Sequence, residues 1–193
     1  MRVLAAVLAL LLGLPPGGTF VDDNGSVHEG SIEAIAAAEI TLGCNPPAND
    51  RFCPSESVTR GQMAAFLNRG IGLPTAVVDQ FLDDDSSTFE KDINAIAQAG
   101  ITLGCNPPDN DRFCPDDSVT RAQMATMLTR ALNLDTAAPD LFSDDTGSTH
   151  EGAINAIGAA GITTGCESTG LNFCPDDPVT RQQMASFLAR ALD

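Results

Sequence analysis

The chain has 193 residues and a formal net charge of −16, from 10 basic and 26 acidic side chains. Nucleic-acid phosphates and anionic membrane surfaces attract clustered Lys and Arg, so this charge excludes both as expected partners. At 43% hydrophobic residues the chain can bury a core, whereas two His, no Trp and no Tyr leave few catalytic bases, so we expect neither an enzyme nor a cofactor.

The N-terminus resembles a secretory signal peptide. Met1-Arg2 is a short basic start, Val3 to Leu14 is an apolar run broken only by Gly13, and a Pro-Pro-Gly-Gly stretch follows. The run is too short for a membrane-spanning helix, which needs about 20 residues. We therefore assign residues 1–18 to a signal peptide and expect a secreted protein with no membrane insertion after its removal.

The remainder consists of three copies of one unit. Phe20, Phe81 and Phe142 are spaced by 61 residues, and the 17-residue segment that starts at Cys44 recurs at Cys105 with 14 identical positions. We assign repeat 1 to residues 19–73, repeat 2 to 80–134 and repeat 3 to 141–193. Short connectors that carry Pro and Asp join them.

Each unit is predicted to form two helices around a loop. In the first helix of repeat 2, Ile93, Ile96 and Ala97 follow the spacing of an apolar stripe that faces a core. Gly100 and its counterpart Gly161 suit a left-handed helix end, where repeat 1 has Glu39. A unit of this size cannot bury two helical stripes alone, so we expect the three units to share a core.

Two Cys bracket the loop of each unit. Six Cys allow 15 connectivities, and the repeat symmetry favours three local disulfides over pairs between copies. Zinc is the alternative, but structural zinc sites usually carry closely spaced Cys or His ligands, which this sequence lacks. The predicted pairs are Cys44 with Cys53, Cys105 with Cys114, and Cys166 with Cys174.

The second helix starts with a capping box, in which Thr59, Thr120 and Thr180 are each followed three residues later by Gln. A stripe of Met and apolar residues indicates core packing. An Arg near the last turn of each copy, at positions 69, 130 and 190, is interpreted as helix termination, because a cation is favourable there.

These motifs resemble the S-layer-homology family three times over. The matching elements are the Phe-x-Asp start, the Ile-x-x-Gly turn, the Phe-Cys-Pro loop end and the Val-Thr-Arg helix start, and the Cys pairs look like an actinobacterial-type variant. The resemblance implies a mainly α fold, a pseudo-threefold spindle of three helix-loop-helix repeats with a central helical bundle. It also implies an anchoring module of the cell wall or S-layer that binds a secondary wall polysaccharide, often pyruvylated, in grooves between repeats. The alternative is a secreted protein-interaction module without polymer binding.

The resemblance maps sugar contacts onto the Arg of the helix start. An Arg in the first helical position is unfavourable by up to about 1 kcal/mol, so something must offset it. One offset is a nearby Asp, such as Asp22, Asp83 or Asp144. The other is an anionic sugar held by the Arg together with unoccupied helix amides. If the sugar is the offset, replacing all three Arg with Ala should abolish wall binding with only a modest fall in the thermal midpoint. The predicted ligand residues are Arg60, Arg121, Arg181, His28, Phe89, His150, Gly43, Gly104 and Gly165.

No metal site is assigned. The Asp22-Asp23-Asn24-Gly25 stretch places Phe20 and Ser31 where a calcium loop of the EF-hand type requires acidic ligands. Loose calcium binding by the acids of the Cys loops remains open. These are Asp109, Asp111, Asp116 and Asp117.

Overall fold

The structure, a computed structural model, describes residues 18–193, so the predicted signal peptide lies almost wholly outside the described residues. The expected mainly α class is confirmed, since this part contains six helices and isolated β-bridges but no strand. None of these helices is long and apolar enough to cross a membrane. The helices are α2 (Glu29–Ala37), α3 (Arg60–Ile71), α4 (Glu90–Gln98), α5 (Arg121–Leu132), α6 (Glu151–Ala159) and α7 (Arg181–Ala191).

The chain divides into two compact units that do not follow the sequence repeats. One unit combines the segment up to Ser57 with Thr180–Asp193 and contains α2 and α7, and the other is Val58–Val179 with α3 to α6. The boundaries of the three repeats therefore stay a prediction from the sequence, because packing groups the chain differently.

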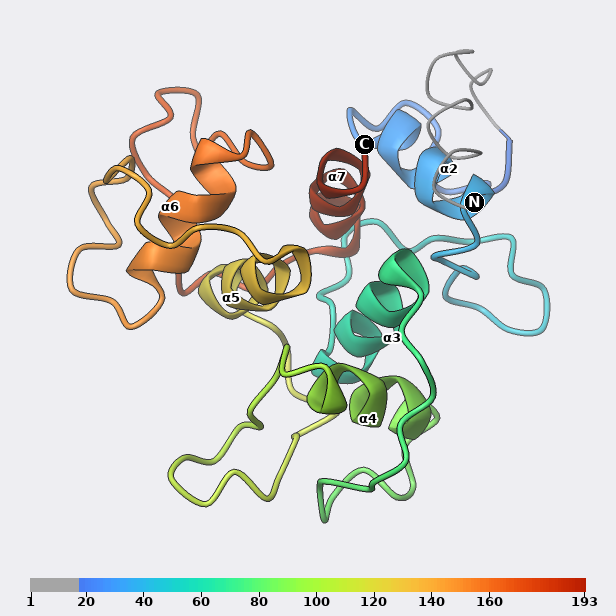
Figure 1. Cartoon of the computed structure of the whole chain (residues 1–193). Helices are drawn as coiled ribbons and strands as arrows, with labels where there is room; N and C mark the ends of the chain where they lie inside the picture. The colour runs from blue at the N-terminus through green and yellow to red at the C-terminus, as the bar shows by residue number, and fades with distance from the viewer. Residues whose placement is uncertain (1–17) are drawn as a thin grey trace. The chain divides into compact units, whose positions relative to one another are not determined.

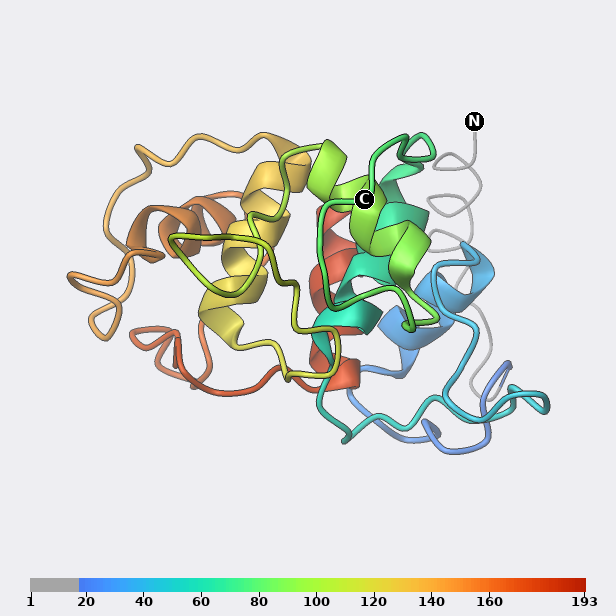
Figure 2. The ribbon, with the colours of Figure 1, turned by 90° about the horizontal axis from the view of Figure 1, so that it is seen from below.

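The helices pair across repeats. Helix α3 of repeat 1 packs against α4 of repeat 2, α5 of repeat 2 packs against α6 of repeat 3, and α2 packs against α7 (Figure 1). The pairing of α5 (yellow) with α6 (orange) is also visible from below in Figure 2. The first helix of one repeat thus covers the apolar stripe of a second helix from another, so a single repeat lacks the partner that buries its stripes.

The predicted stripes form the core. Ile93 and Ile96 of α4 and Met124 of α5 are fully buried, as are the repeat-equivalent Met63 and Met184. The three predicted capping boxes are all present, and each Thr side chain accepts a hydrogen bond from the amide of the Gln three residues later. The Met stripe is therefore core packing, as predicted.

The predicted left-handed helix ends are present in all three repeats, with φ of 59° at Glu39, 72° at Gly100 and 73° at Gly161. Gly lacks the Cβ that makes this region costly, whereas Glu39 must adopt it with a side chain.

A ring of backbone hydrogen bonds joins the residues that precede the capping Thr within Val58–Val179. The amide of Val58 donates to the carbonyl of Val179 (2.8 Å), Val119 donates to Val58 (2.9 Å) and Val179 donates to Val119 (3.0 Å). All three Val side chains are fully buried. The ring gives this unit a local threefold contact between three segments that follow one another at intervals of 61 and 60 residues along the chain, which no sequence motif had indicated.

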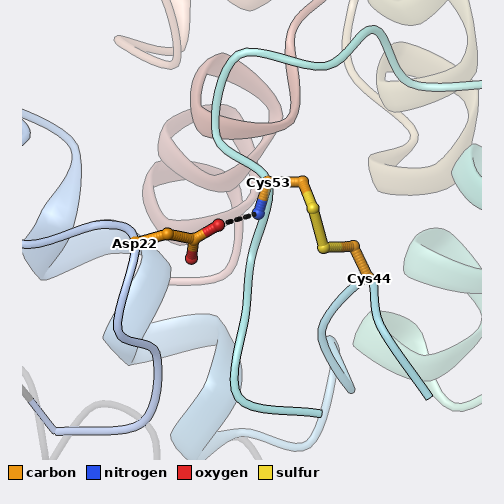
Figure 3. Close-up of side chains that lie close together, drawn as sticks. All are labelled: Asp22, Cys44 and Cys53. Atoms are coloured by element: carbon orange, nitrogen blue, oxygen red, sulfur yellow. Dashed lines mark hydrogen bonds between the residues drawn. A yellow bond between two sulfur atoms is a disulfide. The ribbon is translucent and has the colours of Figure 1, made fainter. Parts of the chain in front are cut away.

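The three local disulfides are confirmed as Cys44–Cys53, Cys105–Cys114 and Cys166–Cys174, which answers the zinc alternative because these sulfurs are bonded to each other. The Asp of each Phe-x-Asp start holds the end of the same loop. Asp22 accepts hydrogen bonds from the amides of Phe52 (2.7 Å) and Cys53 (2.9 Å), the second of which is drawn in Figure 3. Phe20 packs against Phe52 with ring centroids 5.5 Å apart.

Removing one bridge tests how much the loop depends on it. Replacing both Cys105 and Cys114 with Ser should lower the free energy of unfolding by about 2.7 kcal/mol, the loop-closure entropy of roughly ten residues. Denaturant unfolding measures the difference. In excess reductant the native protein also loses its bridges, so the two proteins should then unfold alike. A difference that persisted under reductant would assign the effect to the side chains instead.

Candidate functional site

A pocket of about 470 Å³ lies within the Val58–Val179 unit. Its walls are the turn from Ile101 to Cys105, the pocket-facing side chains of α5, and the Thr149–His150 pair that precedes α6. Arg60 from the start of α3 and Pro107 and Asn110 of the second Cys loop also line it. Residues of all three sequence repeats therefore contribute to one concave site.

The pocket is positively charged although the chain as a whole is acidic. Its lining includes two arginines, Arg60 and Arg130, and no Asp or Glu. With a formal net charge of −16, most of the surface repels anions. The two guanidinium groups make this pocket a place where an anionic group can bind.

Arg60 is a buried part of the pocket, with 4% of its surface exposed. Its Nε donates to the carbonyl of Phe113 (2.6 Å) and its Nη2 donates to that of Gly104 (3.2 Å). The guanidinium carbon lies 4.7 Å from the centroid of the Phe113 ring, which is cation–π geometry. Burial lowers the pKa of Arg60, while the negative charges of Asp117 and Asp83 oppose that shift.

The repeat-equivalent Arg121 and Arg181 make the same contacts with the Cys loops of repeats 3 and 1, respectively. Arg121 donates through Nε to Phe173 and lies over its ring at 4.6 Å. Arg181 donates to Phe52 and lies over its ring at 4.7 Å, and its Nη2 reaches the carbonyl of Gly43. Each is 3% exposed. Burial against carbonyls and a ring is thus the offset that the structure shows for a cation at these helix starts.

The expectation of unoccupied helix amides beside these arginines is wrong. The amide of Arg60 donates to the carbonyl of Asp117 and that of Gly61 to the carbonyl of Pro115, both at 2.8 Å. The starts of α5 and α7 are bonded in the same way to the loops ending at Asp177 and Glu56. Because loop carbonyls already satisfy these donors, an anion cannot use them.

The suggested Asp partners of the arginines have another role. The carboxylate of Asp83 accepts hydrogen bonds from the amides of Phe113 (2.7 Å) and Cys114 (2.9 Å). Asp144 does the same for Phe173 and Cys174. Burial lowers the pKa of Arg60 and of Arg121, and the charges of Asp83 and Asp144 oppose this lowering.

The predicted glycines make a close approach to the end of the Cys loop. Gly104 has φ of 99°, and a Cβ there would lie 2.6 Å from the carbonyl oxygen of Arg112. Gly43 and Gly165 have φ of 85° and 95° and comparable contacts. Only a residue without a side chain allows this backbone path, which presents the carbonyl of Gly104 to Arg60.

His28, Phe89 and His150 occupy the N-cap positions of the three first helices, but none makes a side-chain cap. His150 lines the pocket, and its Nδ1 lies 2.7 Å from the hydroxyl oxygen Oγ1 of Thr126 on α5. Burial and the charge of Arg130 lower the pKa of His150, so it is neutral at pH 7, although Asp176 opposes the shift. His28 meets Ser186 in the same way, and Phe89 packs beside Gly61.

The pocket residues that were not assigned a ligand role from the sequence include Gln123, Thr126 and Arg130. Gln123 had been assigned only to the capping box, which it forms. Arg130 had been interpreted as helix termination, but its Nη1 donates to the carbonyl of Ile101 (3.2 Å), so its guanidinium reaches the turn that walls the pocket. The recurrence of an Arg at this position in each repeat was the available signal.

Residues 80–125 match the family model described as S-layer homology domain. The chain carries an S-layer homology domain. The match spans α4, the second Cys loop and the start of α5, which together supply much of the pocket wall.

The relatives are much longer proteins. The chain is 33% identical over 140 residues to an S-layer protein of Bacillus thuringiensis subsp. finitimus, which covers 70% of this chain and 16% of that protein. It is 31% identical over 182 residues to an S-layer protein of Bacillus licheniformis, covering 90% and 19% respectively. An endoglucanase of Bacillus sp. (strain KSM-635) is 40% identical over 80 residues, covering 42% and 8%.

The chain therefore spans less than a fifth of the length of these relatives. The same chain is similar to parts of S-layer proteins and to part of an endoglucanase. This supports the interpretation of the chain as an anchoring module of the cell wall. The family and the S-layer relatives indicate a secreted protein of the cell surface or S-layer, as predicted.

Proposed function

We propose that the S-layer homology domain is a non-catalytic anchor that binds an anionic secondary wall polysaccharide in the pocket of the Val58–Val179 unit. The observation that carries the proposal is the charge of the pocket, where two arginines and no acid line the wall of a protein with a net charge of −16. An anionic sugar would be steered there by repulsion from the rest of the surface.

Arg130 is the proposed direct contact with the anion. It is exposed, its planar guanidinium carries several donors, and a carboxylate such as that of a pyruvate ketal matches its fork in a bidentate pair. Arg60 is more deeply placed, and two of its nitrogens already bind carbonyls. We therefore assign Arg60 to the positive potential of the pocket floor and to holding the wall in place.

Neutral polar groups around the pocket suit sugar hydroxyls. Gln123, Thr126 and His150 are half-buried and converge on the lining from α5 and the start of α6. A neutral His can both donate and accept hydrogen bonds, as a hydroxyl partner requires. The repeat-equivalent residues Arg121, Arg181, His28, Phe89, Gly43 and Gly165 remain predicted ligand residues.

The test is a titration of purified wall polymer into the chain and into Arg130→Gln. Loss of a charge-assisted hydrogen bond, worth about 1.5–3 kcal/mol, should weaken binding at least tenfold without changing the fold. Arg112→Gln is the matched control, because Arg112 is exposed on the Cys loop and outside the pocket lining. Equal losses in both variants would indicate general electrostatics, and retention on a protein partner with no polymer binding would favour an interaction module instead.

A further inference from the structure

Asp84 is a buried acid that neither the fold nor the pocket explains. None of its surface is exposed, and neither carboxylate oxygen has a hydrogen-bond partner. Its backbone carbonyl accepts from the amide of Ser87, so the segment is held as a turn while the side chain points inward. A buried carboxylate without a partner is among the costliest groups in a protein, so a partner is expected.

Two further acids lie beside it. Carboxylate oxygens of Asp79, Asp84 and Asp85 all lie within 4.8 Å of one another, and Asp79 and Asp85 are exposed. Burial and the neighbouring charge of Asp79 raise the pKa of Asp84 to about 6. Like charges this close repel each other, and a bound cation would offset that repulsion.

A buried acid with a second acid nearby recurs in the other repeats. Asp23 and Asp145 are each 1% exposed with at least one unpaired oxygen. The nearby acid is Asp140 in repeat 3 and Glu33 in repeat 1, as their effects on the pKa values of Asp145 and Asp23 show.

The second acid occupies different positions in repeats 1 and 2. Repeat 1 has Gly18 where repeat 2 has Asp79, but it has Glu33 where repeat 2 has Asn94. Asn94 donates a hydrogen bond to the carboxylate of Asp79 (3.2 Å) and accepts one from the backbone amide of Gln80 (3.0 Å). In repeat 1, the carboxylate of Glu33 accepts the equivalent hydrogen bond from the backbone amide of Thr19. The backbone amide of Gln80 in repeat 2, or of Thr19 in repeat 1, is thus bound by the side chain of either an Asn or a Glu. In both repeats a second negative charge lies near the buried Asp.

We propose that Asp79, Asp84 and Asp85 bind a calcium ion that ties the connector to the start of repeat 2. Three carboxylates and no nitrogen or sulfur donor form the ligand set of a hard cation, and calcium accepts irregular oxygen shells completed by carbonyls and water. Asp79 comes from the connector, and Asp84 and Asp85 come from the segment that leads into α4. Repeat 2 is the best site, because Asn24 and Thr146 replace Asp85 in repeats 1 and 3.

The proposal does not depend on polysaccharide binding, and calcium chloride alone tests it. Calorimetric titration of the full chain should show calcium binding with a dissociation constant of about 0.1–1 mM, the range of extracellular modules, and weaker binding of magnesium. Asp84→Asn should weaken the tightest site at least tenfold. The matched control is Asp135→Asn, which removes an exposed acid of the next connector, outside the cluster, and should leave the titration unchanged.

Thermal unfolding supplies a second readout. Without calcium, Asp84→Asn should be at least as stable as the native chain, because the repulsion is gone; with saturating calcium the native chain should be the more stable one. If Asp84→Asn fails to fold, the double variant Asp79→Asn with Asp85→Asn takes its place, because both of these acids are exposed. This double variant should then weaken calcium binding. No heat with millimolar calcium, or an unchanged titration in these variants, would overturn the proposal.

Discussion

Replacing Arg60 with Ala is expected to lower the free energy of unfolding by about 3–5 kcal/mol. The change leaves the carbonyls of Phe113 and Gly104 without their donor, removes the guanidinium from the Phe113 ring, and opens a cavity in a site that is 4% exposed. The sequence alone had suggested a modest effect, which would suit a surface ligand residue. Denaturant unfolding followed by circular dichroism measures the loss.

Two comparisons define the interpretation. Arg112→Ala, which truncates an exposed Arg of the same repeat 2 loop, should change stability by less than about 0.5 kcal/mol. Arg60→Lys keeps the charge but not the planar fork, so it should recover only part of the loss. If Arg60→Ala had the same free energy of unfolding as the native chain, the buried contacts would contribute little to stability, and a ligand-binding role for Arg60 would be favoured. Wall binding by the triple Arg variant is therefore informative only when its folding has been verified.

Gly104→Ala is expected to destabilise the chain by about 3 kcal/mol or more. A non-Gly residue with positive φ costs about 1–2 kcal/mol, and the new Cβ would lie 2.6 Å from the carbonyl oxygen of Arg112 and 3.2 Å from the ring of Phe81. The carbonyl oxygen belongs to the backbone and cannot rotate away, so the turn itself must shift. That shift would also displace the carbonyl that binds Arg60.

Gly100→Ala is the control for Gly104→Ala, since it changes the same residue type at the end of α4. Gly100 also has positive φ, 72°, but nothing lies within 4 Å of the position of its Cβ. It should cost only about 1 kcal/mol, the conformational part of the penalty. Thermal or denaturant unfolding of the two variants separates conformation from steric overlap. Equal losses would mean that the contact with Arg112 relaxes freely.

Much of the local structure could be predicted because its causes lie within a few residues. The stripe that includes Ile93 and Ile96, the capping boxes at Thr59 and its counterparts, and the left-handed end at Gly100 depend on spacings of three or four residues. The disulfides follow from the repeat symmetry of a short loop. Even Glu39 adopts the conformation expected from the glycines of the other repeats.

The candidate site was predicted only in part. Arg60, Gly104 and His150 do line one pocket, but the role of Arg60 could not be read from its place in the capping motif. Its acceptors are 53 and 44 residues away along the chain, and the neighbouring helix amides are occupied by a loop more than 50 residues distant. Arg130 was overlooked because a favourable helix-end charge already explained it.

The sequence by itself determined the repeats, the helices with their starts and ends, the core residues and the three disulfides. Only the tertiary structure decided that helices pair across repeats, that the arginines are buried against the loop of the next repeat, and that Asp79, Asp84 and Asp85 meet. The physical reason is range. Helix periodicity, capping and short-loop closure are set by neighbouring residues, whereas burial and desolvation depend on which distant surfaces cover a side chain.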